Sequence, residues 1–185
     1  MDPRAPLVLD TRELGRRPGS QREVEQTVPA PADLGIEVLA VPEGSPVVLD
    51  LRLEAVMEGV LVTGTATAGL AGECVRCLDA VTDEVEARFQ ELYVYDDDGD
   101  SRQGDDQDDD VSRLERDLLD LEPVLRDAVV LALPFQPLCE EDCPGLCTEC
   151  GARLADDPDH GHEDPVDPRW AGLAALRQDP GDAPA

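Results

Sequence analysis

The fold is decided by residues 47–68, which read VVLDLRLEAVMEGVLVTGTATA. From Leu49 to Met57 every second residue is apolar, and those between them are charged except Val56, which is the period of a half-buried strand. Glu58-Gly59 is the candidate two-residue turn, since glycine readily adopts the positive φ that such turns need. This turn would place five pairs on one apolar face: Met57 with Val60, Ala55 with Val62, Leu53 with Gly64, Leu51 with Ala66, and Leu49 with Ala68. We therefore predict a long antiparallel hairpin over about 47–68.

Three further segments have the composition of strands. A long one runs from about Val81 to Tyr95 and keeps its apolar residues in one phase. Ile36–Val41 is predicted to form a strand, and Leu7–Leu9 a short edge strand. Together with the hairpin, these segments predict an antiparallel β-sheet.

One main helix is predicted after the sheet. Its apolar residues recur at intervals of three and four, namely Leu121, Val124, Leu125, Ala128 and Val129. Asp120 is a candidate N-cap, and Pro134 and Pro137 end the helix. A short final helix is predicted from Asp167-Pro168 to about Arg177. The predicted class is α+β: an antiparallel sheet built on the long hairpin and a third long strand, one main helix, a Cys-rich C-terminal segment and a short final helix.

The chain of 185 residues has room for one domain with tails. Residues 1–30 show little periodicity and are predicted to form an extended N-terminal segment. A single domain then covers 31–178, and 179–185 form a frayed tail. Residues 96–110 contain nine aspartates in fifteen positions, a repulsion that no burial can offset. We therefore predict a disordered acidic loop over 96–110.

Acidic residues dominate the composition, with 43 against 15 basic residues and a formal net charge of −28. Affinity for nucleic acids comes largely from cations that release counterions from phosphates. Direct binding to naked RNA is therefore expected to be weak or absent, unless arginines such as Arg52, Arg76 and Arg88 form a local patch. A basic protein partner suits the charge better. The alternative is that the surplus acid only keeps the protein soluble.

The sequence from Met1 to Ser20 lacks the apolar stretch of a signal peptide, and no apolar run is long enough to span a membrane. This pattern predicts a cytoplasmic protein without membrane association. The six cysteines would then lie in a reducing compartment, where clustered cysteine more often binds metal than forms disulfides.

Four cysteines follow the spacing C-x3-C-x3-C-x2-C, and they are Cys139, Cys143, Cys147 and Cys150. The last two, followed by Gly151, have the form of a zinc knuckle, in which glycine admits a tight turn around the ion. We predict a structural Zn²⁺ held by these four thiolates. Alternative ligands are Cys74 and Cys77, which form a second knuckle-like pair, and His160 and His162. Eight ligands can also serve two ions, and reduced cysteines can instead pack as small apolar residues.

Several separate motifs resemble the YceD family, named the large ribosomal RNA subunit accumulation protein and formerly catalogued as a domain of unknown function. They are GVLVTG at 59–64, GECVRCL at 72–78, LALP at 131–134, the cysteine run at 139–151 and DPRW at 167–170. The resemblance covers about Leu34 to Leu176. The cysteine cluster is similar to that of Gram-positive members, which tend to end it with C-x-C where this chain has His160-Gly161-His162. The resemblance implies a role in the synthesis, processing or stability of 23S ribosomal RNA, and it brings no catalytic residues.

The sequence favours binding over catalysis. It contains no nucleophile–base pair, phosphate loop or dinucleotide fingerprint, and thiolate ligands suit a closed structural zinc site. We therefore expect a ribosome-biogenesis factor whose partner is a basic large-subunit ribosomal protein or a pre-ribosomal particle. Two alternatives stay open. One is a zinc-dependent enzyme or nuclease in rRNA maturation, and the other is a thiol redox-sensing protein that uses Cys74 and Cys77.

Overall fold

The computed structural model describes residues 2–95, 111–162 and 169. The chain divides into two compact units, Met1–Cys143 and Pro144–Ala185. The first unit contains every strand and the one helix found in the described residues, while the described part of the second consists of turns and one isolated β-bridge.

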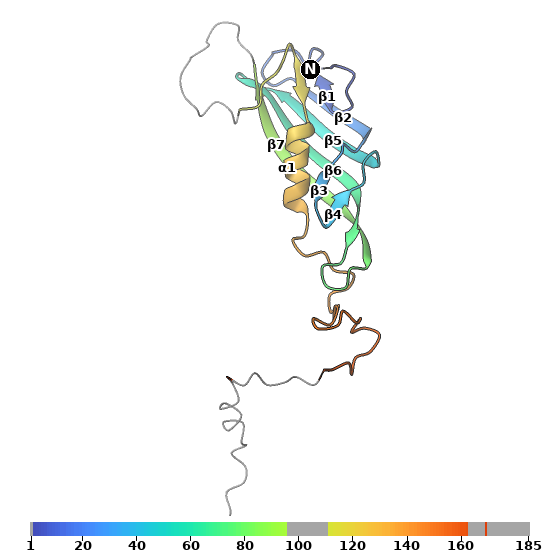
Figure 1. Ribbon diagram of the computed structural model, residues 1–185. Helices are drawn as coiled ribbons and strands as arrows, with labels where there is room; N and C mark the ends of the chain where they lie inside the picture. The colour runs from blue at the N-terminus through green and yellow to red at the C-terminus, as the bar shows by residue number, and fades with distance from the viewer. Residues whose placement is uncertain (1, 96–110, 163–168, 170–185) are drawn as a thin grey trace, which may run out of the picture. The chain divides into compact units, whose positions relative to one another are not determined.

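Strand β6 (Gly59–Glu73) is the centre of the main sheet (Figure 1). One of its edges pairs along its whole length with β7 (Ala80–Val94). The other edge pairs with β5 (Pro46–Ala55) over residues 60–68. These pairings are antiparallel, which confirms the predicted sheet, its long hairpin and its third long strand.

Three shorter pairings complete the main sheet. Beyond β5, the edge of β6 pairs with β4 (Leu39–Val41), which in turn pairs with β3 (Leu34–Ile36). The predicted single strand Ile36–Val41 is therefore wrong, because a turn at Val38, whose carbonyl accepts the N–H of Glu73 at 3.0 Å, divides it. On the far side of β5 lies β2 (Gln21–Pro29). The extended N-terminal segment predicted for 1–30 thus contributes a nine-residue strand to the sheet.

The predicted hairpin forms with a register that differs by two residues. Leu51 lies opposite Gly64 instead of Ala66, and Ala55 lies opposite Val60, so the predicted pairs are wrong. Met57 belongs to the turn and is 86 % exposed, although the predicted register placed it on the buried face. Because side-chain direction along a strand has a period of two, a shift of two leaves the other predicted core residues on the correct face.

Gly59 explains the difference in register. It is not a turn residue with positive φ but the first residue of β6, opposite Val94. A Cβ at this position would overlap the backbone carbonyl of Tyr93. The glycine is therefore needed for the close approach of β7, and the turn moves back to Met57 and Glu58.

A small second sheet consists of β1 (Val8–Asp10) and β8 (Leu118–Asp120). The short edge strand predicted at Leu7–Leu9 is thus confirmed with a shift of one residue. Helix α1 (Glu122–Ala132) follows β8 directly. Its N-cap is Leu121 and not Asp120, although the Asp120 carboxylate accepts the N–H of Glu122 at 2.9 Å.

Helix α1 lies against one face of the sheet alongside β7, as Figure 1 shows. The residues that face the core are Leu125 and Val129, both fully buried. On the sheet, the matching inner face is formed by aliphatic residues with a few aromatics, including Leu49, Leu51, Leu53, Val62, Phe89 and Tyr93. The opposite, outer face of β2, β5, β6 and β7 carries charged residues and threonines that are exposed or half-buried.

Three predictions lie outside the described residues. They are the acidic loop at 96–110, the final helix from Asp167 to Arg177, of which only Arg169 is described, and the tail at 179–185. In the part of the chain that the structure describes, no helix combines the length and the apolar character needed to cross a membrane.

A paired substitution on β5 tests the inner and outer faces. Leu51 is fully buried, so Leu51→Asp should lower the free energy of unfolding by roughly 3–5 kcal/mol, because it leaves an unpaired charge in the core. The adjacent Arg52→Asp breaks an exposed ion pair with Glu54 and places an acid opposite Glu23, and it should cost only about 1 kcal/mol. Urea unfolding midpoints of the two variants measure the difference. Equal midpoints would contradict the assignment of the faces.

Candidate metal centres

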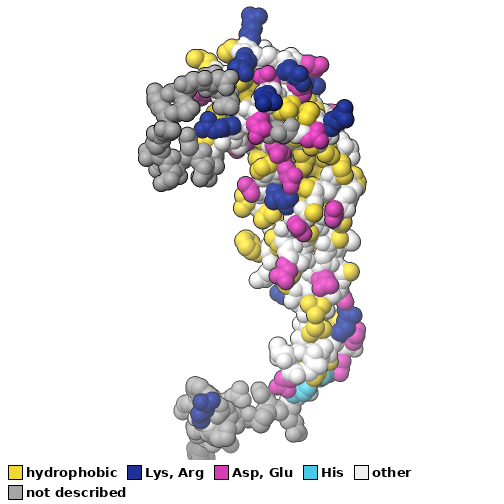
Figure 2. Space-filling view, turned by 45° about the horizontal axis from the view of Figure 1, so that its top comes forward, with side chains coloured by type: hydrophobic (Ala, Val, Ile, Leu, Met, Phe, Trp, Pro, Cys, Tyr) yellow, Lys and Arg dark blue, Asp and Glu magenta, His cyan; other side chains and the backbone are white. Residues whose placement is uncertain are grey.

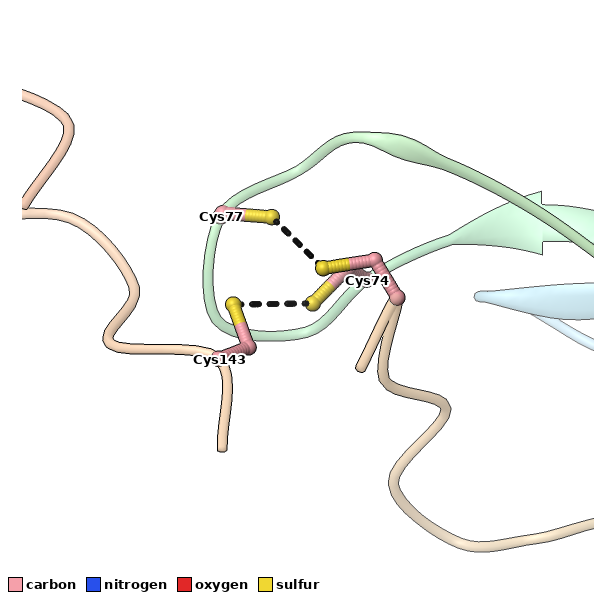
Figure 3. A group of neighbouring side chains, drawn as sticks. Cys74, Cys77 and Cys143 are labelled. Atoms are coloured by element: carbon pink, nitrogen blue, oxygen red, sulfur yellow. Dashed lines mark hydrogen bonds between the residues drawn. The ribbon is translucent and has the colours of Figure 1, made fainter. Parts of the chain in front are cut away.

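Four cysteines of the first unit converge on one point. They are Cys74, Cys77, Cys139 and Cys143, and their sulfur atoms all lie within 4.8 Å of one another. The Sγ atoms of Cys74 and Cys143 are 3.8 Å apart, and those of Cys77 and Cys139 are 3.5 Å apart. Four sulfurs at about 2.3 Å from a tetrahedral zinc ion are about 3.8 Å from one another. Figure 3 shows Cys74, Cys77 and Cys143 pointing toward one another. None of the six cysteines of the chain forms a disulfide.

The sheet positions two cysteines of this cluster, and the segment after the helix positions the other two. Cys74 follows the last residue of β6, and Cys77 lies in the turn that leads to β7. The segment after α1 brings Cys139 and Cys143 to the same turn. Two hydrogen bonds join the segments: the N–H of Val75 donates to the Pro137 carbonyl at 3.0 Å, and Arg76 Nη1 donates to the Cys143 carbonyl at 2.9 Å.

A second cluster lies within the second unit, and it consists of Cys147, Cys150, His160 and His162. Cys150 Sγ is 3.2 Å from Nε2 of His160 and 3.3 Å from Nε2 of His162, and the two Nε2 atoms are 3.0 Å apart. A tetrahedral zinc ion with two sulfur and two nitrogen ligands has S–N and N–N separations of about 3.6 and 3.3 Å. The cluster therefore presents a complete set of ligands for one ion.

The outer nitrogen of each imidazole faces a carboxylate. His162 Nδ1 is 3.4 Å from a carboxylate oxygen of Glu149, and His160 Nδ1 is 3.9 Å from one of Asp157. Metal-binding histidines commonly direct their second nitrogen toward a carboxylate, which fixes the tautomer and the orientation of the ring. Both rings thus have the arrangement of metal ligands that bind through Nε2.

The two C-x2-C motifs adopt the same backbone turn. In the first, the N–H of Leu78 donates to the Cys74 carbonyl at 2.9 Å, and in the second the N–H of Gly151 donates to the Cys147 carbonyl at 2.9 Å. The residue after the second cysteine has a positive φ in both, 63° at Leu78 and 73° at Gly151. A leucine rarely takes this conformation, so its presence indicates that the surrounding structure holds the first turn closed.

The same turns make the first cysteine of each motif acidic. Burial raises the pKa of Cys74, but hydrogen bonds to its sulfur from the backbones of Cys139, Cys77 and Arg76 outweigh burial and lower the pKa to about 6. The pKa of Cys147 is also lowered to about 6, chiefly by backbone hydrogen bonds from Cys150 and Glu149. Each turn therefore holds a thiolate at neutral pH, and the thiolate is the form of cysteine that binds metal ions.

Two other thiols of the first cluster, those of Cys77 and Cys139, resist ionisation. Burial, followed by the neighbouring thiols of Cys139 and Cys74, raises the pKa of Cys77 to about 12. The pKa of Cys139 is raised as well, because the thiols of Cys143 and Cys74 and burial together outweigh its hydrogen bond with Cys77. A cation bound among the four sulfur atoms would stabilise their thiolate forms and remove this resistance. Both clusters can therefore bind a metal ion.

All eight candidate ligands lie in these two clusters, which divide the C-x3-C-x3-C-x2-C run between them. Cys139 and Cys143 are grouped with Cys74 and Cys77, whereas Cys147 and Cys150 are grouped with the two histidines. The sequence alone left open whether these eight residues bind one ion or two. It also missed Glu149 and Asp157, whose place beside the histidines has no signature in the sequence.

The three arginines considered as an RNA-binding patch are already engaged. Arg52 pairs with Glu54 at 2.9 Å and Arg88 with Glu86 at 2.7 Å, on strands that β6 separates. Arg76 lies in the turn between β6 and β7 and donates to the Cys143 carbonyl. These residues do not form one compact basic surface.

The chain is similar to one protein family and to several individual proteins. The model of the family described as "Large ribosomal RNA subunit accumulation protein YceD" matches residues 62–177. The chain is 46 % identical over 172 residues to "Uncharacterized protein Rv2926c" of Mycobacterium tuberculosis, covering 93 % of this chain and 82 % of that protein. It is 44 % identical to "Uncharacterized protein ML1660" of Mycobacterium leprae over 93 % of this chain and 78 % of that protein. "Uncharacterized protein YlbN" of Bacillus subtilis is 28 % identical over 71 % of this chain and 74 % of that protein. No solved structure matches the chain.

Gly151 has a positive φ, so a substitution at this position tests the geometry of the second turn. Gly151→Ala meets no neighbouring atom but places a side chain on a left-handed backbone, at a cost of about 1 kcal/mol. Zinc affinity of the second cluster should therefore fall roughly fivefold, as measured by competition with a chromogenic chelator. Gly161→Ala is the matched control, because Gly161 lies between the two histidines without a positive φ, and an added Cβ would meet only the Asp159 carbonyl oxygen at an ordinary distance of 4.0 Å. Equal affinities for the two variants would contradict the turn geometry.

Proposed function

This chain belongs to the YceD family of large ribosomal RNA subunit accumulation proteins, and from that membership we propose that it promotes the accumulation of 23S rRNA in the cytoplasm by binding rather than by catalysis. The match of the family model over residues 62–177 carries the proposal. It covers most of β6, all of β7 and α1, and the eight candidate metal ligands.

The chemistry of the first cluster supports a binding role. Four thiolates complete the coordination of a tetrahedral zinc ion and leave no position for a water molecule or a substrate, which is the arrangement of structural sites. The ion at Cys74, Cys77, Cys139 and Cys143 is therefore Zn²⁺ with a structural role. It fastens the segment after α1 to the end of the β6–β7 hairpin. Its metal-bound charge of −2 lies beside Arg76.

The outer face of the sheet supports a basic partner. This face carries more acidic than basic side chains: Glu23, Glu25, Asp50, Glu54, Glu84 and Glu86 against Arg52 and Arg88. Both arginines are paired with a glutamate of the same strand. On the face of the first unit shown in Figure 2, basic side chains are likewise interspersed with acidic ones. A basic large-subunit ribosomal protein, free or within a pre-ribosomal particle, fits this surface better than naked RNA does.

Deletion of the gene tests the cellular role. Loss of the protein should lower 23S rRNA and large subunits relative to 16S rRNA and small subunits. Northern hybridisation and sucrose-gradient profiles of the deletion strain and of a complemented strain measure the ratio. An unchanged ratio under growth-limiting conditions would contradict the proposed function.

Binding measurements test the kind of partner. At physiological salt, the purified protein should bind 23S fragments more weakly than micromolar, because counterion release is largely lacking. It should retain basic large-subunit proteins in pull-downs, and raised salt should weaken that complex. The triple variant Glu23→Gln, Glu25→Gln, Asp50→Asn should reduce retention severalfold. The control variant, Glu37→Gln with Glu43→Gln, neutralises two exposed acids in turns outside the strands of the outer face and should not. Tight, steeply salt-dependent RNA binding by the unmodified protein would contradict the indirect mechanism.

A further inference from the structure

The described part of the second unit, residues 144–162, has an ordered backbone without a hydrophobic core. None of its apolar side chains is buried, and its two leucines, Leu146 and Leu154, are only half-buried. Burial of apolar surface is the main favourable term in folding, and short segments that lack it need a disulfide or a metal ion instead. No disulfide is present, because Cys147 and Cys150 are free thiols.

Backbone order in this segment is concentrated around the C-x2-C turn. The N–H of Cys147 donates to the Ala152 carbonyl at 2.7 Å, and the N–H of Leu154 donates to the Gly145 carbonyl at 3.1 Å. A β-bridge pairs Leu146 with Arg153. So few hydrogen bonds contribute little net stability in water. They cannot by themselves offset the conformational entropy that the segment loses.

The side chains point to what supplies the missing stability. Cys147 and Cys150 come from the turn, whereas His160 and His162 come from the end of the described segment, and all four ligand atoms lie within 4.8 Å of one another. A tetrahedral set of two thiolates and two imidazoles is typical of zinc. Two thiolates balance the charge of Zn²⁺, so the loaded site is neutral. The two imidazole Nε2 atoms lie 3.0 Å apart and each is within 3.3 Å of the Cys150 sulfur atom, which is the close spacing of ligands around one ion.

We infer that Cys147, Cys150, His160 and His162 form a second zinc site, separate from the four-cysteine site, and that its ion folds residues 144–162. Each cluster supplies four ligands from within one unit, and neither needs a residue of the other. The protein therefore binds two zinc ions per chain. The inference is independent of the role in rRNA accumulation, because it concerns only the metal and the folding of this segment.

Metal content tests the number of ions and their ligands. Full-length protein, purified reduced and without chelator, should contain two zinc ions per chain by mass spectrometry of the metal. The double variant His160→Ala, His162→Ala should contain one, and so should Cys77→Ser, Cys139→Ser, which affects only the first site. Asp159→Asn, next to His160 but outside the cluster, should keep two. Replacing both histidines by cysteine restores a tetrahedral set and should restore the second ion.

Hydrogen exchange tests the folding role. Amides of residues 146–154 should be protected in the unmodified protein and should lose that protection in the double-alanine variant, while amides of β6 and β7 stay protected. The double-cysteine variant should regain protection. The inference is overturned if the double-alanine variant keeps two ions, if the unmodified protein supplied with excess zinc holds only one, or if the segment stays protected after its ion is lost.

Discussion

The pairing of β6 with β7 is the constraint on which the rest of this structure depends. Fifteen consecutive residue pairs, from Gly59 with Val94 to Glu73 with Ala80, join the two strands. Their inner face is buried under α1, and their far end is the turn that contains Cys74 and Cys77. Because the strands fix that turn and α1 fixes the start of the following segment, cysteines 62 and 69 positions apart in the sequence meet at one point.

Two different features organise this chain, a hydrophobic core and two clusters of candidate metal ligands. The sheet and α1 are held by a core of leucine, valine and alanine with few aromatic residues, which extends to Leu133. Beyond that point the buried residues of the described chain are only Pro137, Cys143 and Gly145. Six of the eight candidate metal ligands follow Leu133 in the sequence. This organisation supports the proposal that the protein acts by binding, with metal ions in structural roles.

Sequence alone predicted which residues of the long hairpin face the core, because alternation has a period of two. It missed the register, because the pattern does not reveal that Gly59 must lie against the backbone of Tyr93. It gave no sign of β2, since this strand carries polar residues such as Glu23 and Gln26 on both faces. All eight candidate metal ligands could be named from the sequence by residue type. Their division could not be predicted, because the spacing of a cysteine run says nothing about which distant pair the fold brings to it.

The central claim is that six cysteines and two histidines divide into one four-cysteine site and one site with two cysteines and two histidines. X-ray absorption at the zinc edge of the fully loaded protein tests it most directly, since the spectrum averages over both ions. We expect a mean shell of three sulfur atoms at about 2.3 Å and one nitrogen atom at about 2.0 Å per zinc. A shell of four sulfur atoms, as a single site formed by Cys139, Cys143, Cys147 and Cys150 would give, would contradict it.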